Sequence, residues 1–474
     1  MKKYLLILLL VSCLSPIVLS QDVQRFAERS LIGTARYVGM GGAMTAIGGD
    51  PSAVIDNPAG LGLYRRSELS ITFDETIDRT QQQGTSDTYQ SMRFTVPQLS
   101  AIWATGYPNR QRGFIFNNVM VAINRLQSFN REIHVAGQNL GMLPTICLKT
   151  NLLPENDLQN LPWDNVDIGW LSILGYEGYL IDPIQDDQWI PAVEMTLGEL
   201  AISESGSSDL YTVSWGGNIN NQWYIGASLN IPTLSYTKRI SLSETGNQSS
   251  AQLQSFFHAT GVGATASFGL ISRPTEWLRI GMAVHTPTLM ALTVQTEGDM
   301  YSKHGTDTYE VYTPASGSVN MSIASPLRTT TSIAWQWKNH GLLSLQYDFA
   351  HATHDDTDIS PMNDVHTLRA GFEAQVCRGL YINAGYIYES SFTNQEDIVS
   401  LNYNSIRTDT DYRYTQSSQT VSAGIGYRNQ YLVANIAYMY GWQLLHQYAT
   451  ECQTNALNIN THTHRIVGTL AWRL

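Results

Sequence analysis

Histidine and aspartate side chains gather at two places where they could bind a metal ion or transfer protons. The two groups are His351-Ala352-Thr353-His354-Asp355-Asp356 and His462-Thr463-His464. The first lies where a strand is expected to end in a loop, so no helix directs both rings at one metal ion. The second would place both rings on one face of a strand, near its outer rim. No Ser-His-Asp spacing identifies a hydrolase without its fold. We interpret both groups as solvated polar residues and predict no catalytic residue, no metal site and no cofactor.

Cysteine usage and net charge narrow the class of protein further. Removing the predicted signal peptide leaves Cys147, Cys377 and Cys452, which are far apart and form no CxxC pair. Such a set argues against a disulfide framework and against a zinc or redox site built from cysteines. The formal net charge of −12, with a pI near 5.3, argues against a nucleic-acid partner, which would favour a basic surface.

The N-terminus predicts export from the cytoplasm. Lys2 and Lys3 precede a short apolar run, and small residues follow just before Gln21. This pattern is typical of a signal peptide over residues 1–20, with cleavage after Ser20. Lipoprotein processing at Cys13 is the alternative.

A glycine-rich stretch over residues 36–63 is the least ordinary part of the sequence. Seven glycines and two prolines fall within twenty-eight residues, together with apolar side chains and almost no charge. Glycine loosens a helix or strand and proline removes a donor, so neither element explains the composition. The stretch is also too apolar for a solvated linker. We therefore expect its backbone to pack closely inside something larger.

The composition of the whole chain suggests what this larger structure is. Tyrosine (25) and tryptophan (11) are abundant, and charged residues make up only 14%. After the signal peptide no run approaches the about 20 apolar residues of a membrane helix. Together with export, these features favour an outer-membrane β-barrel. A large secreted all-β protein, such as a propeller or a sandwich, is the alternative.

Alternation of side chains supports the barrel. Segments with a period of two residues, typical of strands with two different faces, lie at 223–231, 278–285, 380–388 and 431–440. One face carries apolar residues with aromatic residues at its ends, and the other carries mostly Gly, Ser, Asn, Arg and His. This is the pattern of strands with lipid outside and a polar lumen inside.

Connector lengths give a strand count. Short connectors are expected at 220–221, 273–275, 338–341, 378–379 and 429–430, and long ones at 81–90, 244–252, 353–364 and 390–411. Short turns alternating with long loops are typical of a transmembrane barrel. The alternation holds if the segment 317–337 is one strand with a bulge at Pro326. Residues 68–474 then form about fourteen antiparallel strands.

Two features interrupt this regularity. The connector over residues 127–209 is long and proline-rich, and we expect it to cap the barrel mouth outside the cell. In the third strand, strict alternation would place Phe114 and Phe116 on one face and Val119 on the other, although all three are apolar. The simplest interpretation is a bulge at Asn117-Asn118, since a slip of one residue turns every side chain over. Alternatively, one end of this strand faces water.

The glycine-rich stretch resembles the N-terminal hatch of FadL-type channels for hydrophobic compounds. The matching segments, in order, are Gly39-Met40-Gly41-Gly42-Ala43, Gly49-Asp50-Pro51-Ser52-Ala53 and Asn57-Pro58-Ala59-Gly60-Leu61. The Asn-Pro-Ala motif of that family is intact. The resemblance implies an all-β protein with a 14-stranded antiparallel transmembrane barrel (67–474) and a hatch, or plug, in its lumen (21–66).

The resemblance also implies a function in the bacterial outer membrane. A FadL-type channel would take up hydrophobic small molecules passively, either long-chain fatty acids or aromatic hydrocarbons. Gly41, Gly42, Asn57, Pro58 and Ala59 would then belong to the gating hatch. Lateral exit to the lipid of the outer membrane would occur at a kink in the third strand, where Asn117 and Asn118 lie. The chain would not be an enzyme.

An interaction barrel is the competing hypothesis. Some relatives of this family resemble accessory components of secretion systems at the outer membrane. The long 127–209 connector would suit partners among envelope proteins.

Overall fold

The computed structural model describes residues 22, 25–26, 29–85, 88–107, 112–315, 318–337, 340–351, 363–391 and 401–474. The predicted signal peptide, including Cys13, lies outside these residues. The same holds for His354, Asp355 and Asp356 of the first histidine group.

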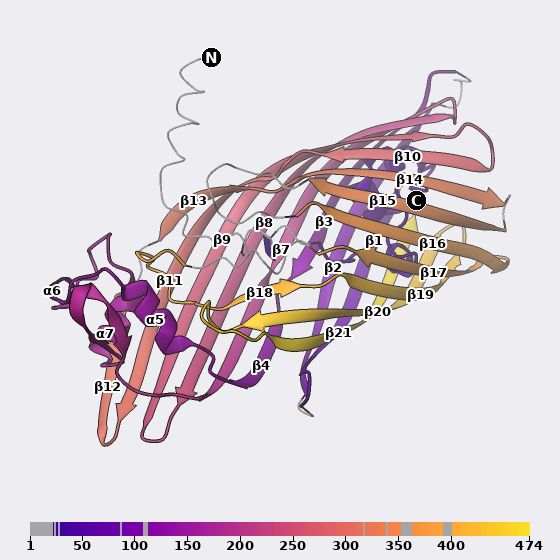
Figure 1. Cartoon of the computed structure of the whole chain (residues 1–474). Helices are drawn as coiled ribbons and strands as arrows, with labels where there is room; N and C mark the ends of the chain where they lie inside the picture. Colours follow the sequence, from indigo (N-terminus) through magenta and orange to yellow (C-terminus); the bar gives the residue numbers. More distant parts are fainter. Residues whose placement is uncertain are drawn as a thin grey trace, which may run out of the picture.

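Antiparallel strands pair in sequence order and form a closed barrel of fourteen strands, because β1 pairs with both β2 and β21 (Figure 1). Their bounds are β1 (Glu68–Gln82), β2 (Thr88–Gly106), β3 (Phe114–Ser128), β4 (Arg131–Gln138), β7 (Leu197–Ile219), β8 (Trp223–Thr245), β9 (Ser249–Ser272), β10 (Leu278–His285), β11 (Leu289–His304), β12 (Asp307–Tyr312), β13 (Val319–Ala324), β14 (Leu327–Trp337), β15 (Gly341–His351), β16 (Val365–Cys377), β17 (Leu380–Glu389), β18 (Tyr412–Thr415), β19 (Ser418–Arg428), β20 (Leu432–Tyr448) and β21 (Leu457–Arg473). Four barrel strands are interrupted: β3 continues as β4, β10 as β11, β12 as β13 and β14, and β18 as β19. The predicted fold class and strand number are confirmed.

Pro326 interrupts a strand without ending it. β13, before the proline, pairs with β11, and β14, after it, pairs with β10. Ala324 lies opposite Leu289, and Arg328 lies opposite His285, so both strands bend at the same height. A proline has no N–H for the ladder, which explains why it is tolerated only at such an irregularity. The interpretation of 317–337 as one strand is confirmed.

The outer face of the barrel is apolar. Side chains alternate between buried and exposed along the strands, and large exposed residues include Met92 (62%), Phe94 (68%), Leu229 (70%) and Leu289 (67%). Exposed apolar side chains on alternate positions of a closed barrel form the surface that lipid would cover. Within the described residues, every helix is too short or too polar to cross a membrane.

The wall is taller on one side, and a small helical layer lies there. β7, β8 and β9 have 23, 23 and 24 residues, whereas β15 and β17 have 11 and 10. Residues 139–196 contain α5 (Met142–Thr150), α6 (Glu155–Leu158), α7 (Trp170–Glu177), β5 (Ile181–Pro183), η2 (Gln185–Asp187) and β6 (Trp189–Pro191). Figure 1 shows these helices at one end of the barrel, beside β11 and β12. Their apolar faces form one core with the long strands. We call this layer the cap.

The predicted connectors are longer than those observed. The segment expected as a loop over 127–209 begins with β4 and ends with β7, which pair with each other. The connectors expected over 81–90 and 244–252 are short turns, since β1 ends at Gln82, β2 starts at Thr88, β8 ends at Thr245 and β9 starts at Ser249. Strands that extend past the apolar belt are polar on the outside, so their sequences look like loops.

Three short helical pieces near the N-terminus fill the inside of the barrel: α3 (Ala35–Gly39), α4 (Pro51–Asp56) and the 3₁₀ helix η1 (Pro58–Leu63). Each starts with a side-chain cap, from Thr34, Asp50 and Asn57 respectively. The backbone N–H of Ala35 donates to Thr469 in β21, and that of Thr45 donates to Gln346 in β15. Because these pieces contact strands on several sides of the barrel, they lie in the lumen. We call residues 29–66 the plug.

Candidate functional site

Asn57, Pro58 and Ala59 form the joint between α4 and η1. The Asn57 side chain accepts a hydrogen bond from the N–H of Ala59 (3.0 Å), and its Nδ2 donates to the carbonyl oxygens of Thr45 (2.9 Å) and of Leu270 in β9 (3.4 Å). Pro58 occupies the first position of η1, where its missing N–H costs nothing. The buried motif therefore connects two parts of the plug to each other and to the wall.

Glycines let the plug backbone touch the wall. Gly41 and Gly42 have φ values of +60° and +71°, a conformation that favours glycine. On the wall, several glycines have so little room that an added Cβ would lie within 3.0 Å of a plug atom: Gly216, Gly226, Gly269, Gly281, Gly371 and Gly385. Alternation placed some of these glycines on the polar face of their strands, but it did not predict that they contact the backbone of the plug. Their signal in the sequence is glycine repeated at lumen-facing positions.

Asp56 makes one of two ion-paired contacts that the described residues form between the plug and the wall; the other joins Arg36 of α3 to Glu373 of β16 (2.9 Å). The carboxylate of Asp56 accepts a hydrogen bond from the hydroxyl of Tyr37 (2.5 Å) and forms an ion pair with Arg328 of β14 (3.1 Å). The guanidinium of Arg369 in β16 lies 3.7 Å from the same carboxylate. Burial by itself would raise the pKa of Asp56, but the charges of Arg328 and then Arg369 outweigh it and hold the pKa below its usual range. The carboxylate is therefore ionised at neutral pH and fixes α4 to two strands.

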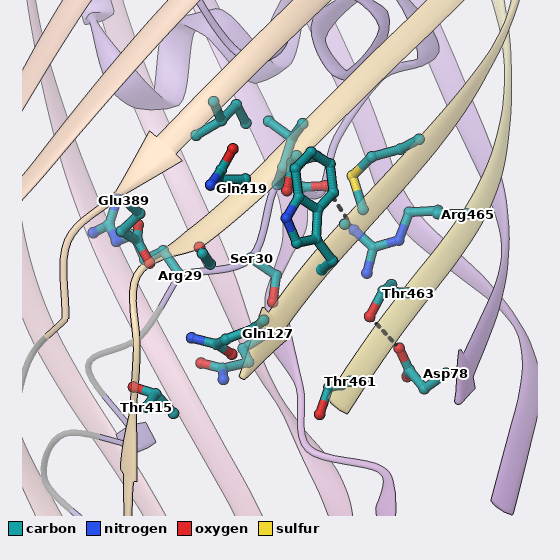
Figure 2. Close-up of a pocket in the computed structure, with 18 of the residues that line it drawn as sticks. Arg29, Ser30, Asp78, Gln127, Glu389, Thr415, Gln419, Thr461, Thr463 and Arg465 are labelled. Atoms are coloured by element: carbon teal, nitrogen blue, oxygen red, sulfur yellow. Dashed lines mark hydrogen bonds between the residues drawn. The ribbon is translucent and has the colours of Figure 1, made fainter. Parts of the chain in front are cut away.

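A polar cavity of about 240 Å³ lies between the plug and the walls toward the cap (Figure 2). Its charged lining consists of Arg25, Arg29, Arg93, Arg131, Arg369, Arg465, Asp78 and Glu389. Five of these six arginines have carboxylate partners, most of them outside the lining: Arg25 and Arg131 pair with Glu204 (3.1 and 2.8 Å), Arg93 with Asp78 (2.8 Å), Arg369 with Asp348 (2.9 Å) and Arg465 with Asp74 (3.2 Å). Figure 2 shows Thr463 donating to Asp78 on one side of the cavity and Arg29 beside Glu389 on the other. The cavity would accept a negatively charged group more readily than a purely apolar one.

Arg29 is the arginine of this cavity that could still bind an acceptor. It lines both this cavity and a smaller one beside β14, and it is partly buried. Within the described part of the chain, no hydrogen bond or ion pair joins its guanidinium to another residue. Burial, and next the charge of Arg328, lower the pKa of Arg29 to about 9, so it still carries its proton at neutral pH. A carboxylate is the usual partner for such a group. No sequence pattern marked this residue.

The wall has a break in its hydrogen-bonded ladder, on the side of the cavity. β2 pairs with β3 from Gln98 to Gly106. Closer to the cap, the described part of β2 pairs only with β1, and β4 pairs only with β7. Pro97 stands where the pairing stops, and it has no N–H to continue the ladder. We call the unpaired edges of β2 (88–97) and β4 (131–138) the seam.

Side chains close the seam in this conformation. The guanidinium of Arg93 donates to the carbonyl oxygen of Asn130 (2.8 Å), and the rings of Tyr89 and His134 stack with centroids 4.3 Å apart. Such contacts separate at a lower cost than a backbone ladder, because only a few side chains must move. Gln82 of β1 also exchanges two hydrogen bonds with the backbone of Ala136 in β4 (2.7 and 3.0 Å), so the seam is closed by side chains and not by a backbone ladder.

Asn117 and Asn118 lie away from this break. Their ladders with β2 and β7 are continuous, and the register shifts of β3 are at Ile115 and Leu126. The predicted bulge at Asn117-Asn118 is therefore wrong: the irregularity at Ile115 changes the face of Phe114 only, and Phe116 lies on the same face as Asn118. Asn118 instead anchors the plug, since its Nδ2 donates to the carbonyl oxygens of Leu61 (2.8 Å) and Tyr64 (2.9 Å).

The described histidines of the two groups have partners among neighbouring side chains. His351 pairs with Asp364 (3.1 Å) on the exposed rim. His462 and His464 each share a hydrogen bond with a tyrosine of β20. No group of three or more His, Cys, Asp or Glu residues in the described ranges could hold a metal ion.

No protein-family model and no curated protein matches this sequence. Solved structures do match it. The toluene transporter TodX of P. putida has a TM-score of 0.52 at 12% identity, over 94% of this chain and 99% of that one. A FadL homologue of Pseudomonas aeruginosa has a TM-score of 0.51 at 13% identity, over 94% and 98%. At such identities the similarity shows the fold, so this chain has the FadL-type barrel fold.

Proposed function

We propose that this FadL-type barrel is a channel of the bacterial outer membrane for passive uptake of hydrophobic small molecules. The observation that carries the proposal is the combination of a plugged lumen, a cavity next to the plug and a seam in the wall beside that cavity. A pore for ions or sugars needs neither the plug nor the seam.

Physical cost explains why a hydrophobic molecule would need this arrangement. Apolar surface that leaves a greasy site for water costs about 25 cal/mol per Å². In our proposal the molecule is captured at the cap outside the cell, enters the cavity, and leaves sideways into the lipid. It is therefore exposed to water only briefly.

The seam is the proposed lateral exit. It lies closer to the cap than Asn117 and Asn118, where the resemblance implied the exit. Arg93 and Gln127, which lie near the seam, also line the cavity. A chain molecule in the cavity could pass between β2 and β4 once the Arg93–Asn130 and Tyr89–His134 contacts separate, together with the hydrogen bonds from Thr80 and Gln82 of β1 to the backbone of β4.

Gly41, Gly42, Asn57, Pro58 and Ala59 are the proposed gating elements of the plug. The glycines allow the backbone to change conformation, and the three hydrogen bonds of Asn57 hold the present one. A shift of the plug would enlarge the cavity without opening a wide aqueous pore.

The chemistry of the cavity favours an amphiphile with a carboxylate, such as a long-chain fatty acid, over an aromatic hydrocarbon. An aromatic hydrocarbon would bury the guanidinium of Arg29 without offering it an acceptor, which is unfavourable. A carboxylate would pair with Arg29 while its chain occupied the apolar parts of the passage.

Uptake by whole cells tests this proposal. In a bacterial strain without its own fatty-acid channel, the wild-type protein should restore uptake of a radiolabelled long-chain fatty acid. Arg29→Gln should reduce the initial uptake rate about tenfold at limiting substrate, the value of one lost charge-assisted hydrogen bond. Arg66→Gln, at an exposed arginine of the opposite end, should have no effect.

Two outcomes would contradict the proposal. Uptake of toluene that is independent of Arg29, without uptake of the fatty acid, would replace the acid by a hydrocarbon as substrate. Absence of uptake for both compounds, with normal assembly in the membrane, would reject the channel.

An interaction barrel is the second candidate. Large apolar side chains are exposed on the cap, including Leu152 (81%) and Val166 (80%), and could contact an envelope protein. Recovery of secretion components with the purified barrel, and no retained hydrophobic ligand, would favour this alternative.

A further inference from the structure

The outer face of β1, β20 and β21 carries a cluster of cationic and aromatic groups toward the cap. On β21, Thr461, Thr463 and Arg465 line the lumenal cavity, so the even-numbered residues between them point outward. His462 and His464 are therefore on the outer face.

Two tyrosines of β20 orient these histidines. The hydroxyl of Tyr440 lies 2.8 Å from Nδ1 of His462, and that of Tyr438 lies 2.8 Å from Nδ1 of His464. The ring of Tyr440 also lies 5.0 Å from that of His464. When a tyrosine donates to Nδ1, the imidazole proton is on Nε2. Neither Nε2 has a hydrogen-bond partner among the described residues, so in this tautomer each presents a donor to the outside.

Arg79 adds a permanent positive charge to the same place. It is the register partner of His462 across the β1–β21 ladder, and its side chain is exposed. In the part of the chain that the structure describes, its guanidinium has no hydrogen bond and no ion pair. On β1, the next outward-facing residues after Arg79, going away from the cap, are Ile77 and Glu75. We call Arg79, His462, His464, Tyr438 and Tyr440 the outer patch.

The position of the outer patch relative to the apolar belt indicates its ligand. Directly below it on β21 are the exposed residues Ile466 (46%), Leu470 (38%) and Trp472 (47%), and on β20 Ile436 (52%). The patch therefore lies where the belt ends on the cap side, at the depth of lipid headgroups. Donors and a cation at that depth are complementary to the phosphate of a headgroup.

We propose that the outer patch binds the phosphate of a lipid headgroup in the leaflet around the cap end of the barrel. Arg79 supplies the charge and a forked pair of donors, and the two Nε2 atoms supply further donors. Tyr438 and Tyr440 hold the imidazoles in place and cover the sugar or glycerol part of the headgroup. The chain as a whole carries a formal charge of −12, so an anion needs such a local site. The proposal does not depend on what passes through the lumen.

A similar pair elsewhere on the barrel provides a matched control. On β15 and β16, the hydroxyl of Tyr347 lies 2.7 Å from Nδ1 of His366. The nearby His351 already pairs with Asp364, and the outward positions around His366 in these two strands include no arginine. If imidazole and tyrosine sufficed, His366 would bind the same lipid.

The test uses the full-length protein purified in mild detergent and native mass spectrometry. The probes are diphosphoryl lipid A and the same lipid after its phosphates are removed. The wild-type protein should retain the phosphorylated lipid, and Arg79→Gln should retain about tenfold less at equal concentration, since a charge-assisted contact is lost. Arg79→Lys should keep most of the binding because the charge remains. His462→Gln combined with His464→Gln should weaken it, and His366→Gln should not.

Three results would overturn the proposal. One is equal retention of the phosphorylated and the dephosphorylated lipid. The second is unchanged retention in Arg79→Gln. The third is displacement of the bound lipid by millimolar inorganic phosphate, which would indicate an ordinary anion site. Each variant must keep the gel mobility of the folded barrel in unheated SDS, so that loss of folding is recognised.

Discussion

At the scale of single residues, Asp56 is one of the charges that hold the plug to the wall, together with Arg36, which pairs with Glu373. Tyr37, Arg328 and Arg369, the partners of Asp56, come from three different segments. Removing one member of such a buried group costs about 3–5 kcal/mol, because the other charges stay buried without a partner. Buried ion pairs therefore contribute strongly to holding the plug in place.

This arrangement predicts how the plug responds to pH. Because the pKa of Asp56 is lower in the folded protein than its ordinary 3.8, its contribution to stability is complete above that value and is lost as the pH falls through the folded pKa. Hydrogen exchange of residues 50–64 should be the same at pH 7 and pH 5 after correction for the intrinsic rate, and should increase only below about pH 4. Faster exchange already between pH 7 and pH 5 would contradict this assignment.

Asn57 carries the prediction for gating. Asn57→Ala removes the hydrogen bonds to Thr45, Ala59 and Leu270, and it leaves the buried Thr45 carbonyl and Ala59 N–H without this partner, at about 1–3 kcal/mol each. We expect a less stable plug and an altered uptake rate for the fatty acid, with normal amounts of barrel in the membrane. Unchanged uptake and unchanged hydrogen exchange of the plug would reject a gating role. Asn404→Ala, at an exposed asparagine that contacts the cap, is the control.

At the scale of elements, the seam is the part of the wall that should open. Tyr89→Cys with His134→Cys places two thiols where stacked rings now face each other at 4.3 Å. We expect an oxidised disulfide there to close the seam and to reduce uptake at least tenfold, and reduction with dithiothreitol to restore it. The measurement is uptake by the same cells before and after reduction, in a Cys377→Ser background that removes the exposed native thiol.

A disulfide in the intact ladder is the matched control for the seam. Ser100 and Ala122 are register partners of β2 and β3, within the spacing of an antiparallel pair. Ser100→Cys with Ala122→Cys should cross-link without changing uptake. If both disulfides block uptake equally, the exit is elsewhere.

Elements also show what the sequence could and could not predict. Alternation of side chains and the position of Pro326 predicted the number of strands, since both depend on neighbouring residues. The lengths of β7, β8 and β9 were not predicted, because a strand that is polar on its outer face resembles a loop in sequence. The seam depends on which strands meet across the barrel, and the spare capacity of Arg29 depends on partners distant in the chain. No local pattern reports either of them.

At the scale of the whole molecule, the plug and the barrel are separate layers with separate roles. A barrel of fourteen strands has a lumen wide enough for water once nothing fills it. We predict that deleting residues 29–64 leaves a barrel that assembles and conducts ions in a planar lipid bilayer, whereas the complete chain conducts little. Current recordings at a fixed voltage measure this directly. Equal conductance with and without the plug would show that it does not close the lumen.

The wall glycines that contact the plug have a consequence for how fast the plug can move. Ordinary protein interiors interlock, so one part leaves another only after many side chains change rotamer. Where Gly226, Gly269, Gly281 and Gly385 face the plug, the wall offers no side chain to interlock with. At these positions the plug could shift with few changes of side-chain rotamer in the wall. A ligand that replaces some of the polar contacts of the plug could therefore loosen it without unfolding any strand of the barrel.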